Sequence, residues 1–265
     1  MSSTSSMRLM PGVVAVNTFR EAVRDRVLYN LIFFAFLMIG AAIIVGQISI
    51  GIERLVIINL GLSAISLFGL VMAIFIGVGL VSKEIEKRTL YSLLAKPIRR
   101  WQFIVGKFAG LLLTLTVNTA VMTLGVLLAL VYVGHPYNPY AKEVAIAVYF
   151  ILLSLALVTA LALFFSCFSS PMLSTLFTLG IYIMGVFSED LRSFGEVTNN
   201  QAVGLLTRIL YYMVPNFHNF NAIAIASHGD AISFTQIWQN SLYAVLYVTI
   251  ILVAASAVFS RRNLK

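Results

Sequence analysis

The chain has 265 residues, of which 60% are hydrophobic and 11% are charged, and its formal net charge is +8. A soluble domain carries about one-quarter charged residues, so this composition excludes a soluble globular protein. Uncharged runs of about 20 residues, enough to cross a hydrocarbon core, recur from residue 28 onward, and no charged segment is long enough to form its own core. We therefore predict an all-α, polytopic membrane protein that forms a single domain over residues 1–265.

Residues 11–27 precede the first apolar run and predict a helix that lies in the membrane interface. Val13, Val16 and Phe19 recur at helical spacing, with polar and charged residues on the opposite side. This pattern is typical of helices that rest on a membrane surface. We expect Pro11 to open this interfacial elbow helix, because proline fits the first turn of a helix.

Six apolar runs follow, and we interpret each as a transmembrane helix. The predicted spans are residues 28–48, 55–81, 103–133, 144–165, 172–187 and 238–259. Residues 188–237 are mixed in composition and predict an external segment of short helices that rest on the membrane. Residues 201–214 belong to this segment, because Arg208 interrupts their apolar run and Pro215 ends it.

Basic residues indicate the orientation of the spans, because lysine and arginine gather in loops on the cytoplasmic side. Fourteen of the 18 lie before the first span, between the second and third spans or at the very start of the third (Lys107), or after the sixth. We therefore predict a multi-pass protein of a bacterial inner membrane with both termini in the cytoplasm. Because these residues flank the spans and do not form one patch, we expect membrane lipid but no nucleic acid as a partner.

The cytoplasmic segment 82–102 is the most informative part of the sequence, because residues 82–107 contain nine charged residues. Ser82 is a suitable cap for a helix whose first turn carries Glu84 and Glu86, and a proline further on ends that helix. This pattern predicts a short amphipathic helix with a charged outer face. The alternative is an ordinary basic loop on the cytoplasmic side, which any multispan protein has.

The stretch GLVSKEIEKRTLYSLLAKPIRRWQFIVGKFAG, residues 79–110, resembles the hallmark loop of the type-2 ABC exporter permease family. In that family an acidic helix, a Thr-Leu pair, a Leu-Leu pair, a proline and a later lysine recur at this spacing. The tail, with YYMVPNF at 211–217 and FSRRNL at 259–264, is similar to the family's end pattern. Together with the elbow and the six spans, the resemblance covers nearly the whole chain.

The resemblance implies that segment 82–102 holds a coupling helix, which binds in a cleft of a separate cytosolic ABC ATPase. It assigns ATPase coupling to Glu84, Ile85, Glu86, Lys87, Arg88, Thr89, Leu90, Leu93 and Leu94. It also implies ATP and magnesium on the ATPase, no cofactor on this chain, and a second permease copy or a paralogue. The sequence itself contains no GxxxxGK[ST] phosphate loop, because its one Gly-Lys pair, Gly106-Lys107, is followed by Phe108.

The predicted spans contain no charged residue well inside them, which argues against a carrier that relays protons or ions. Polar residues that remain in the spans are candidates for a substrate path: Asn118, Thr114, Ser154, Thr159 and Tyr182. The alternative is that they hydrogen-bond to neighbouring helices. Gly106 and Gly110 form a small-xxx-small pair that permits close helix contact, and chance spacing explains this pair equally well.

These features favour the membrane-spanning permease subunit of an ATP-driven ABC exporter. The alternatives are an ATP-independent carrier and a membrane scaffold that recruits a soluble partner through the 82–107 loop. The sequence contains no catalytic motif, so we expect a non-catalytic subunit. We also expect no metal site, because the three histidines, His135, His218 and His228, are widely separated and the single cysteine, Cys167, has no second thiol.

Overall fold

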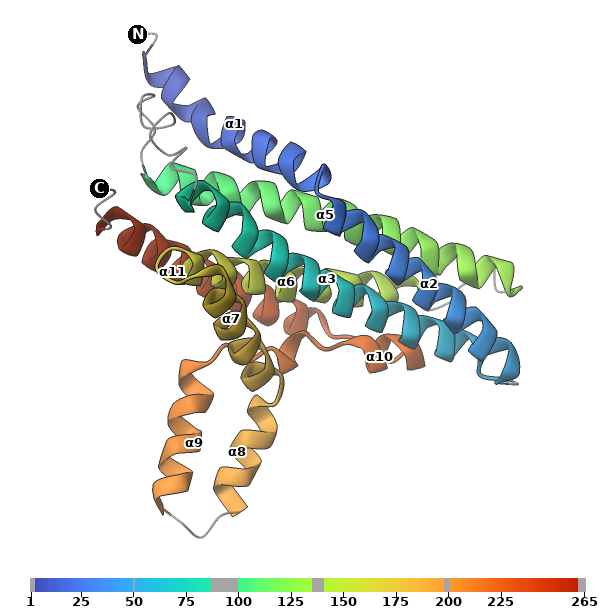
Figure 1. The fold of residues 1–265 in the computed structure, drawn as a ribbon. Coiled ribbons are helices and arrows are strands. Elements are labelled where there is room, and N and C mark those ends of the chain that lie inside the picture. The colour runs from blue at the N-terminus through green and yellow to red at the C-terminus, as the bar shows by residue number, and fades with distance from the viewer. Residues whose placement is uncertain (1–2, 50, 87–99, 135–140, 198–200, 262–265) are drawn as a thin grey trace.

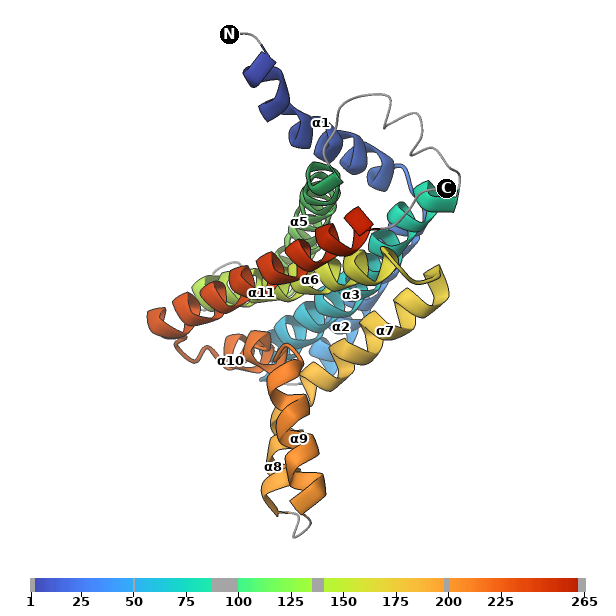
Figure 2. The ribbon, with the colours of Figure 1, turned by 90° about the vertical axis from the view of Figure 1, so that its left-hand side faces the viewer.

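The structure is a computed structural model, and it describes residues 3–49, 51–86, 100–134, 141–197 and 201–261. Every regular element in these residues is a helix, as predicted. The long helices form an elongated bundle, and both termini lie at the same end of it (Figure 1). A pair of short helices projects from the side of the bundle in both ribbon views (Figures 1 and 2).

Helix α1 covers Ser3–Val23, and α2 follows almost directly at Arg26–Ile48. The prediction that Pro11 opens the first helix is wrong, because Pro11 lies inside α1. Proline removes one backbone hydrogen bond from a helix. The carbonyl oxygen of Pro11 lies close to Gly106 of the neighbouring helix, so α1 is closely packed at this position.

The two longest helices are α3, Glu53–Glu86, and α5, Arg100–Tyr132. Gly51 turns the chain between α2 and α3 with a φ of 86°, in the left-handed region that glycine adopts without strain. At 1.5 Å per residue α3 is about 50 Å long, well beyond the roughly 30 Å of a hydrocarbon core. The helix therefore continues past the apolar part of its sequence.

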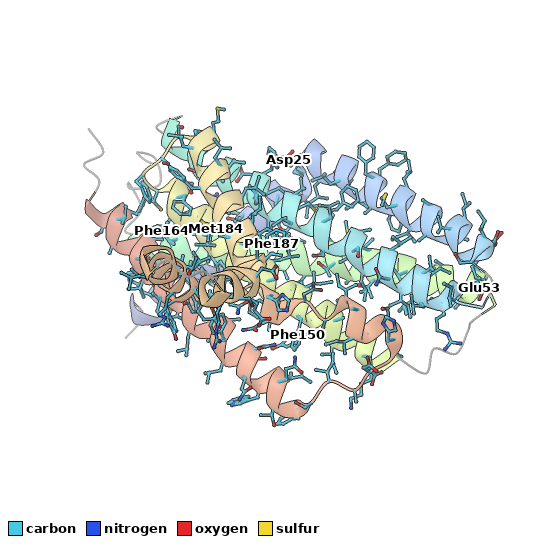
Figure 3. The ribbon with its side chains drawn as sticks, turned by 90° about the horizontal axis from the view of Figure 1, so that it is seen from below. Asp25, Glu53, Phe150, Phe164, Met184 and Phe187 are labelled. Atoms are coloured by element: carbon cyan, nitrogen blue, oxygen red, sulfur yellow. The ribbon has the colours of Figure 1, made fainter. Side chains whose placement is uncertain are left out.

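Helix α6, Ala141–Ser166, lies at the centre of the bundle and packs against α3, α5, α7 and α11. Its sequence is apolar on all sides, as expected for a helix surrounded by others. Phe150 near its middle is fully buried (Figure 3). By contrast, α2 and α11, Phe234–Arg261, expose large apolar side chains such as Phe33 and Ile250. These two helices present surfaces suited to lipid.

Five helices in the described part of the chain are long and apolar enough to cross a membrane: α2, α3, α5, α6 and α11. The remaining predicted span, 172–187, corresponds to α7, Pro171–Val186. This helix is apolar, but its 16 residues cover only about 24 Å at 1.5 Å per residue. The structure thus supports a multi-pass protein with five clear spans and one shorter apolar helix.

The predicted external segment contains four helical elements within the described residues. They are α8, Ser188–Val197; α9, Gln201–Met213; the 3-10 helix η1, His218–Phe220; and α10, Ile223–His228. Helices α8 and α9 lie side by side and form the projecting pair (Figure 1). In contrast, α10 packs against α3 and α6. Short helices were predicted here, and their contact with a membrane surface stays a prediction.

Candidate functional site

The end of α3, the start of α5 and the two chain termini lie together at one end of the bundle (Figure 1). Three of the predicted coupling residues, Glu84, Ile85 and Glu86, form the last turn of α3. The other six lie outside the described residues: Lys87, Arg88, Thr89, Leu90, Leu93 and Leu94. The proposed coupling segment therefore begins inside α3, and the roles of its residues stay predictions.

The prediction that Ser82 caps a separate helix is wrong. Helix α3 runs from Glu53 to Glu86 without a break, so Ser82 lies in its interior. The change from apolar to charged residues near Ser82 marks the end of the hydrocarbon-facing part of the helix. It does not mark the end of the helix, because Lys83, Glu84 and Glu86 are compatible with a helical backbone.

Helix α1 packs against the first turns of α5 through two glycines. A Cβ atom on Gly106 would lie 2.7 Å from the Cβ of Val14, and one on Gly110 would lie 2.5 Å from the backbone oxygen of Ala15. Distances this short leave no room for a side chain. We call this contact the α1–α5 seam. Chance was an equally good explanation of the Gly106 and Gly110 spacing from the sequence alone. In the structure this small-xxx-small pair is used for close helix packing.

A lysine lies between these two glycines and forms an ion pair across the seam. The Nζ atom of Lys107 is 3.5 Å from Glu21 Oε2, and the lysine side chain is 4% exposed whereas that of Glu21 is 49% exposed. The ammonium also lies 5.8 Å from the centre of the Phe103 ring. A buried ammonium is costly unless a carboxylate or other polar groups compensate it. This pair was not predicted from the sequence, although the Gly-Lys-x-x-Gly pattern was its signal.

A small apolar cluster extends the seam toward the C-terminal helix. The rings of Phe103 and Phe259 stack with their centres 5.7 Å apart, so the start of α5 is packed against the end of α11. Val14 and Cys167 belong to the same buried cluster. Cys167 is fully buried, and its Sγ atom lies 3.2 Å from the Leu163 carbonyl oxygen. Four helices therefore meet at this end of the bundle.

The apolar face that we predicted for the elbow helix is not the one that packs on the protein. Val13 and Val16 are 58% and 47% exposed, whereas Val14, Thr18 and Ala22 are buried against the bundle. The predicted face is thus left outward, where it is free to contact lipid. The second, buried face uses small side chains, which hydropathy does not reveal.

Two of the proposed substrate-path residues bond to their own helices. The hydroxyl of Thr114 donates to the Gly110 carbonyl at 2.9 Å, and that of Thr159 donates to the Leu155 carbonyl at 2.7 Å. Both side chains are buried within the chain. Such bonds satisfy a hydroxyl group without a substrate. These two contacts therefore favour the alternative that the hydroxyl groups satisfy hydrogen bonds within the helical bundle and do not line a substrate path.

The other three path residues face different surroundings. Asn118 is buried in α5, and its Nδ2 atom is 3.5 Å from the sulfur of Met72 in α3. Tyr182 of α7 hydrogen-bonds to Ser66, which is also in α3. Ser154 is half-buried in α6. Asn118 and Tyr182 thus attach their helices to α3, the helix that leads into the coupling segment.

Comparison with known protein families matches residues 13–264 to the ABC-2 family transporter proteins. The chain belongs to this family. The match covers almost the whole sequence, so elbow, spans and external segment all fall within one family unit. No curated protein matches the chain. ABC-2 family membership and the apolar helices together establish a multi-pass membrane protein of the transport permease type.

Within this ABC-2 permease, the described histidines have structural contacts. His218 lies 3.4 Å from Glu189, which joins η1 to the first turn of α8. The Nδ1 atom of His228 is 2.9 Å from the carbonyl oxygen of Ala224. Among the described residues, no group of three or more His, Cys, Asp or Glu side chains is placed to hold a metal ion.

Proposed function

We propose that this ABC-2 permease is the membrane subunit of an ATP-driven exporter and couples its spans to a separate cytosolic ATPase. The observation that carries the proposal is the family match over residues 13–264. ATP and magnesium bind the partner ATPase, since this sequence has no phosphate loop of its own. The coupling residues are those of the last turn of α3 and the segment that follows it.

The continuity of α3 supports a mechanical role for this segment. An ATPase can change the shape of the spans only through an element whose contacts differ between two states. A helix that runs unbroken from Glu53 to Glu86 transmits a displacement at its cytoplasmic end along its full length. Asn118 and Tyr182 then carry that displacement to α5 and α7 through their contacts with α3.

The α1–α5 seam supports coupling at the other end of the same segment. Helix α5 begins at Arg100, a few residues before Gly106 and Lys107. A rigid contact between α1 and α5 prevents α5 from rotating independently of the elbow helix. A displacement of the coupling segment therefore moves α5 together with α1. In this proposal α1 lies in the interface of the inner leaflet.

A second permease copy or a paralogue completes the transporter in this proposal, with α7 as the sixth span. A helix of about 24 Å is shorter than the hydrocarbon core, and oligomerisation is one way to relieve such a mismatch. With six spans both termini lie in the cytoplasm, in accord with the basic residues around them. Apart from Lys107 near the start of α5, the span interiors are uncharged, which fits a lipid-like or amphipathic cargo that leaves the cell.

The test is coexpression with the neighbouring genes and copurification in mild detergent, to ask whether an ATPase accompanies this chain. Wild-type permease should retain a stoichiometric ATPase and stimulate its hydrolysis of ATP. The variant E84Q/E86Q should insert normally but lose most of the bound ATPase, because charged groups at a docking surface set orientation and association. A matched control, E143Q/D230N, removes two acids from the opposite end of the bundle and should behave like wild type.

Two results would contradict the proposal. If no ATPase accompanies the intact wild-type permease, the chain is a carrier or a scaffold. If E84Q/E86Q and E143Q/D230N bind and stimulate the ATPase equally well, coupling does not depend on the end of α3.

A further inference from the structure

A polar cavity lies at the end of the bundle away from the two termini, beside Glu53 (Figure 3). It has a volume of about 240 Å³ and lies between the α2–α3 turn and α10. Its lining includes Glu53, Arg54, Ser227 and His228, so a carboxylate, a guanidinium, a hydroxyl and an imidazole meet in one place. None of these groups takes part in the proposed coupling.

The side chains of this cavity are held by local contacts. Glu53 Oε1 accepts a hydrogen bond from the backbone N–H of Gly51 at 3.1 Å, which fixes the carboxylate at the turn. Ser227 lies 3.5 Å from Asn59 Nδ2. His228 Nδ1 lies 2.9 Å from the Ala224 carbonyl oxygen, which can only accept, so Nδ1 carries a hydrogen in this contact and Nε2 is the ring nitrogen left for a ligand.

The cavity also lies at the boundary between apolar and polar surroundings. The apolar part of α2 ends at Ile48, and that of α3 begins at Glu53. Ile44 and Ile48 on α2 are 64% and 75% exposed, and Ile52, which lines the cavity, is 53% exposed. Ile52 therefore gives a ligand whose polar end lies in this cavity an exposed apolar side chain in the cavity lining itself.

We propose that this cavity binds the headgroup of a phospholipid that carries a primary ammonium, such as phosphatidylethanolamine. Arg54 donates to the phosphate oxygens, and Glu53 and His228 Nε2 accept from the ammonium. The acyl chains leave the cavity past Ile52. The volume is below the roughly 300–1,000 Å³ of pockets for whole drug-sized ligands, which suits a headgroup.

The combination of charged and polar groups explains the choice of lipid. A purely anionic headgroup places its phosphate near Arg54 but brings no ammonium to Glu53. Phosphatidylcholine supplies a cation that has no N–H to donate to Glu53 or His228. A headgroup with both a phosphate and a protonated amine interacts with all three side chains. The inference needs a membrane-embedded chain but does not depend on ATPase coupling.

The experiment is native mass spectrometry of the full chain in detergent with one added lipid at a time. Wild-type protein should retain dioleoylphosphatidylethanolamine roughly tenfold better than dioleoylphosphatidylcholine or dioleoylphosphatidylglycerol, as expected for charge-assisted hydrogen bonds. R54Q should weaken the retention of all three lipids, because they share a phosphate, whereas E53Q should lose most of the preference for phosphatidylethanolamine, because Glu53 accepts from its ammonium. K142Q, which removes an exposed cation at the start of α6, should keep both the retention and the preference. Equal retention of the three lipids by wild-type protein would overturn the proposal without any variant.

Two further arms distinguish a bound lipid from a soluble zwitterion and from a general effect of surface charge. Free phosphoethanolamine at millimolar concentration should not displace the lipid, because it lacks acyl chains. Displacement would show that the cavity recognises a soluble zwitterion, and the lipid assignment would be wrong. An equal loss of phosphatidylethanolamine in R54Q and K142Q would show that surface charge alone retains the lipid, and it would likewise overturn the site.

Discussion

Helix α1 and the α8–α9 pair both flank the spans, but they pack in opposite ways. Helix α1 presses against α5 so closely that two glycines and a buried lysine are needed at the contact. Helices α8 and α9 pack chiefly against each other and project from the bundle (Figure 2). Their base is joined to the rest of the chain by the Glu189–His218 contact and by the bond from Phe217 N–H to the Gly185 carbonyl.

The difference indicates which parts of the permease move together. Close backbone packing makes α1 and α5 one mechanical unit, since interfaces of this kind have discrete arrangements and do not deform continuously. The α8–α9 pair has few attachments, so its orientation depends on what lies around it. Exposed Leu205, Ile209 and Tyr212 on α9 give this pair an apolar surface of its own. The contrast leads to four tests, from the largest expected effect to the smallest.

The first test asks whether the two regions lie on opposite sides of the membrane. The single cysteine, Cys167, is fully buried, so wild-type protein should not react with a membrane-impermeant maleimide. S193C on α8 should react in intact spheroplasts, whereas N17C on α1 should react only after lysis. Both positions are exposed, so the contrast reports sidedness and not burial. Reaction of N17C in intact spheroplasts would contradict cytoplasmic placement of the N-terminal helix.

The second test breaks the seam with a single methyl group. The added Cβ in G110A would lie 2.5 Å from the Ala15 carbonyl oxygen, and a backbone atom cannot move aside cheaply. Overpacking of this kind costs about 1–3 kcal/mol, so the apparent Tm in detergent should fall. G40A in α2 is the control, because nothing lies within 4 Å of its new methyl group. Equal melting of G110A and G40A would show that α1 is not tightly packed.

The contact partners of this seam explain why the sequence predicted only part of the fold. Hydropathy located the long spans because apolar length is a local property, and α2 ends at Ile48 as predicted. The Gly106–Gly110 spacing was visible, but nothing in the sequence said which helix would meet it. Contact with α1 is a tertiary property, and so is the choice of Val14 over Val13 as the buried side chain.

The candidate coupling site, too, was predicted only in part from the sequence. The charged segment after the second span was predicted on the same side as the termini, and the end of α3 and the start of α5 do lie near the termini (Figure 1), whereas the coupling role stays a prediction. The prediction that a new helix starts at Ser82 was wrong. The sequence changes there from apolar to charged residues, but the helical backbone continues without interruption. Lys107 was passed over because a lone lysine near a span end normally extends to the interface, whereas here it is buried opposite Glu21.

The third test removes the charge of Glu21 from the seam. In E21Q the buried ammonium of Lys107 keeps its other contacts but loses its carboxylate partner at 3.5 Å. Because Glu21 is half exposed and water screens the pair, we expect a loss of about 1 kcal/mol, less than for G110A. Melting in detergent at low and high salt measures it. D230N removes an exposed acid elsewhere and should leave the apparent Tm unchanged; a matching drop there would contradict the role of the pair.

The last test addresses the α8–α9 pair, whose internal contact is weak and exposed. The Arg192 guanidinium lies 5.6 Å from the centre of the Tyr211 ring, and such a contact contributes about 0.5–1 kcal/mol at an exposed site. R192Q should therefore speed amide hydrogen exchange in α8 and α9 by roughly two- to fivefold and leave α1 and α5 unchanged. R208Q removes an exposed arginine from α9 and is the matched control. If it accelerates exchange as much as R192Q, net charge and not the Arg192–Tyr211 contact holds the pair together.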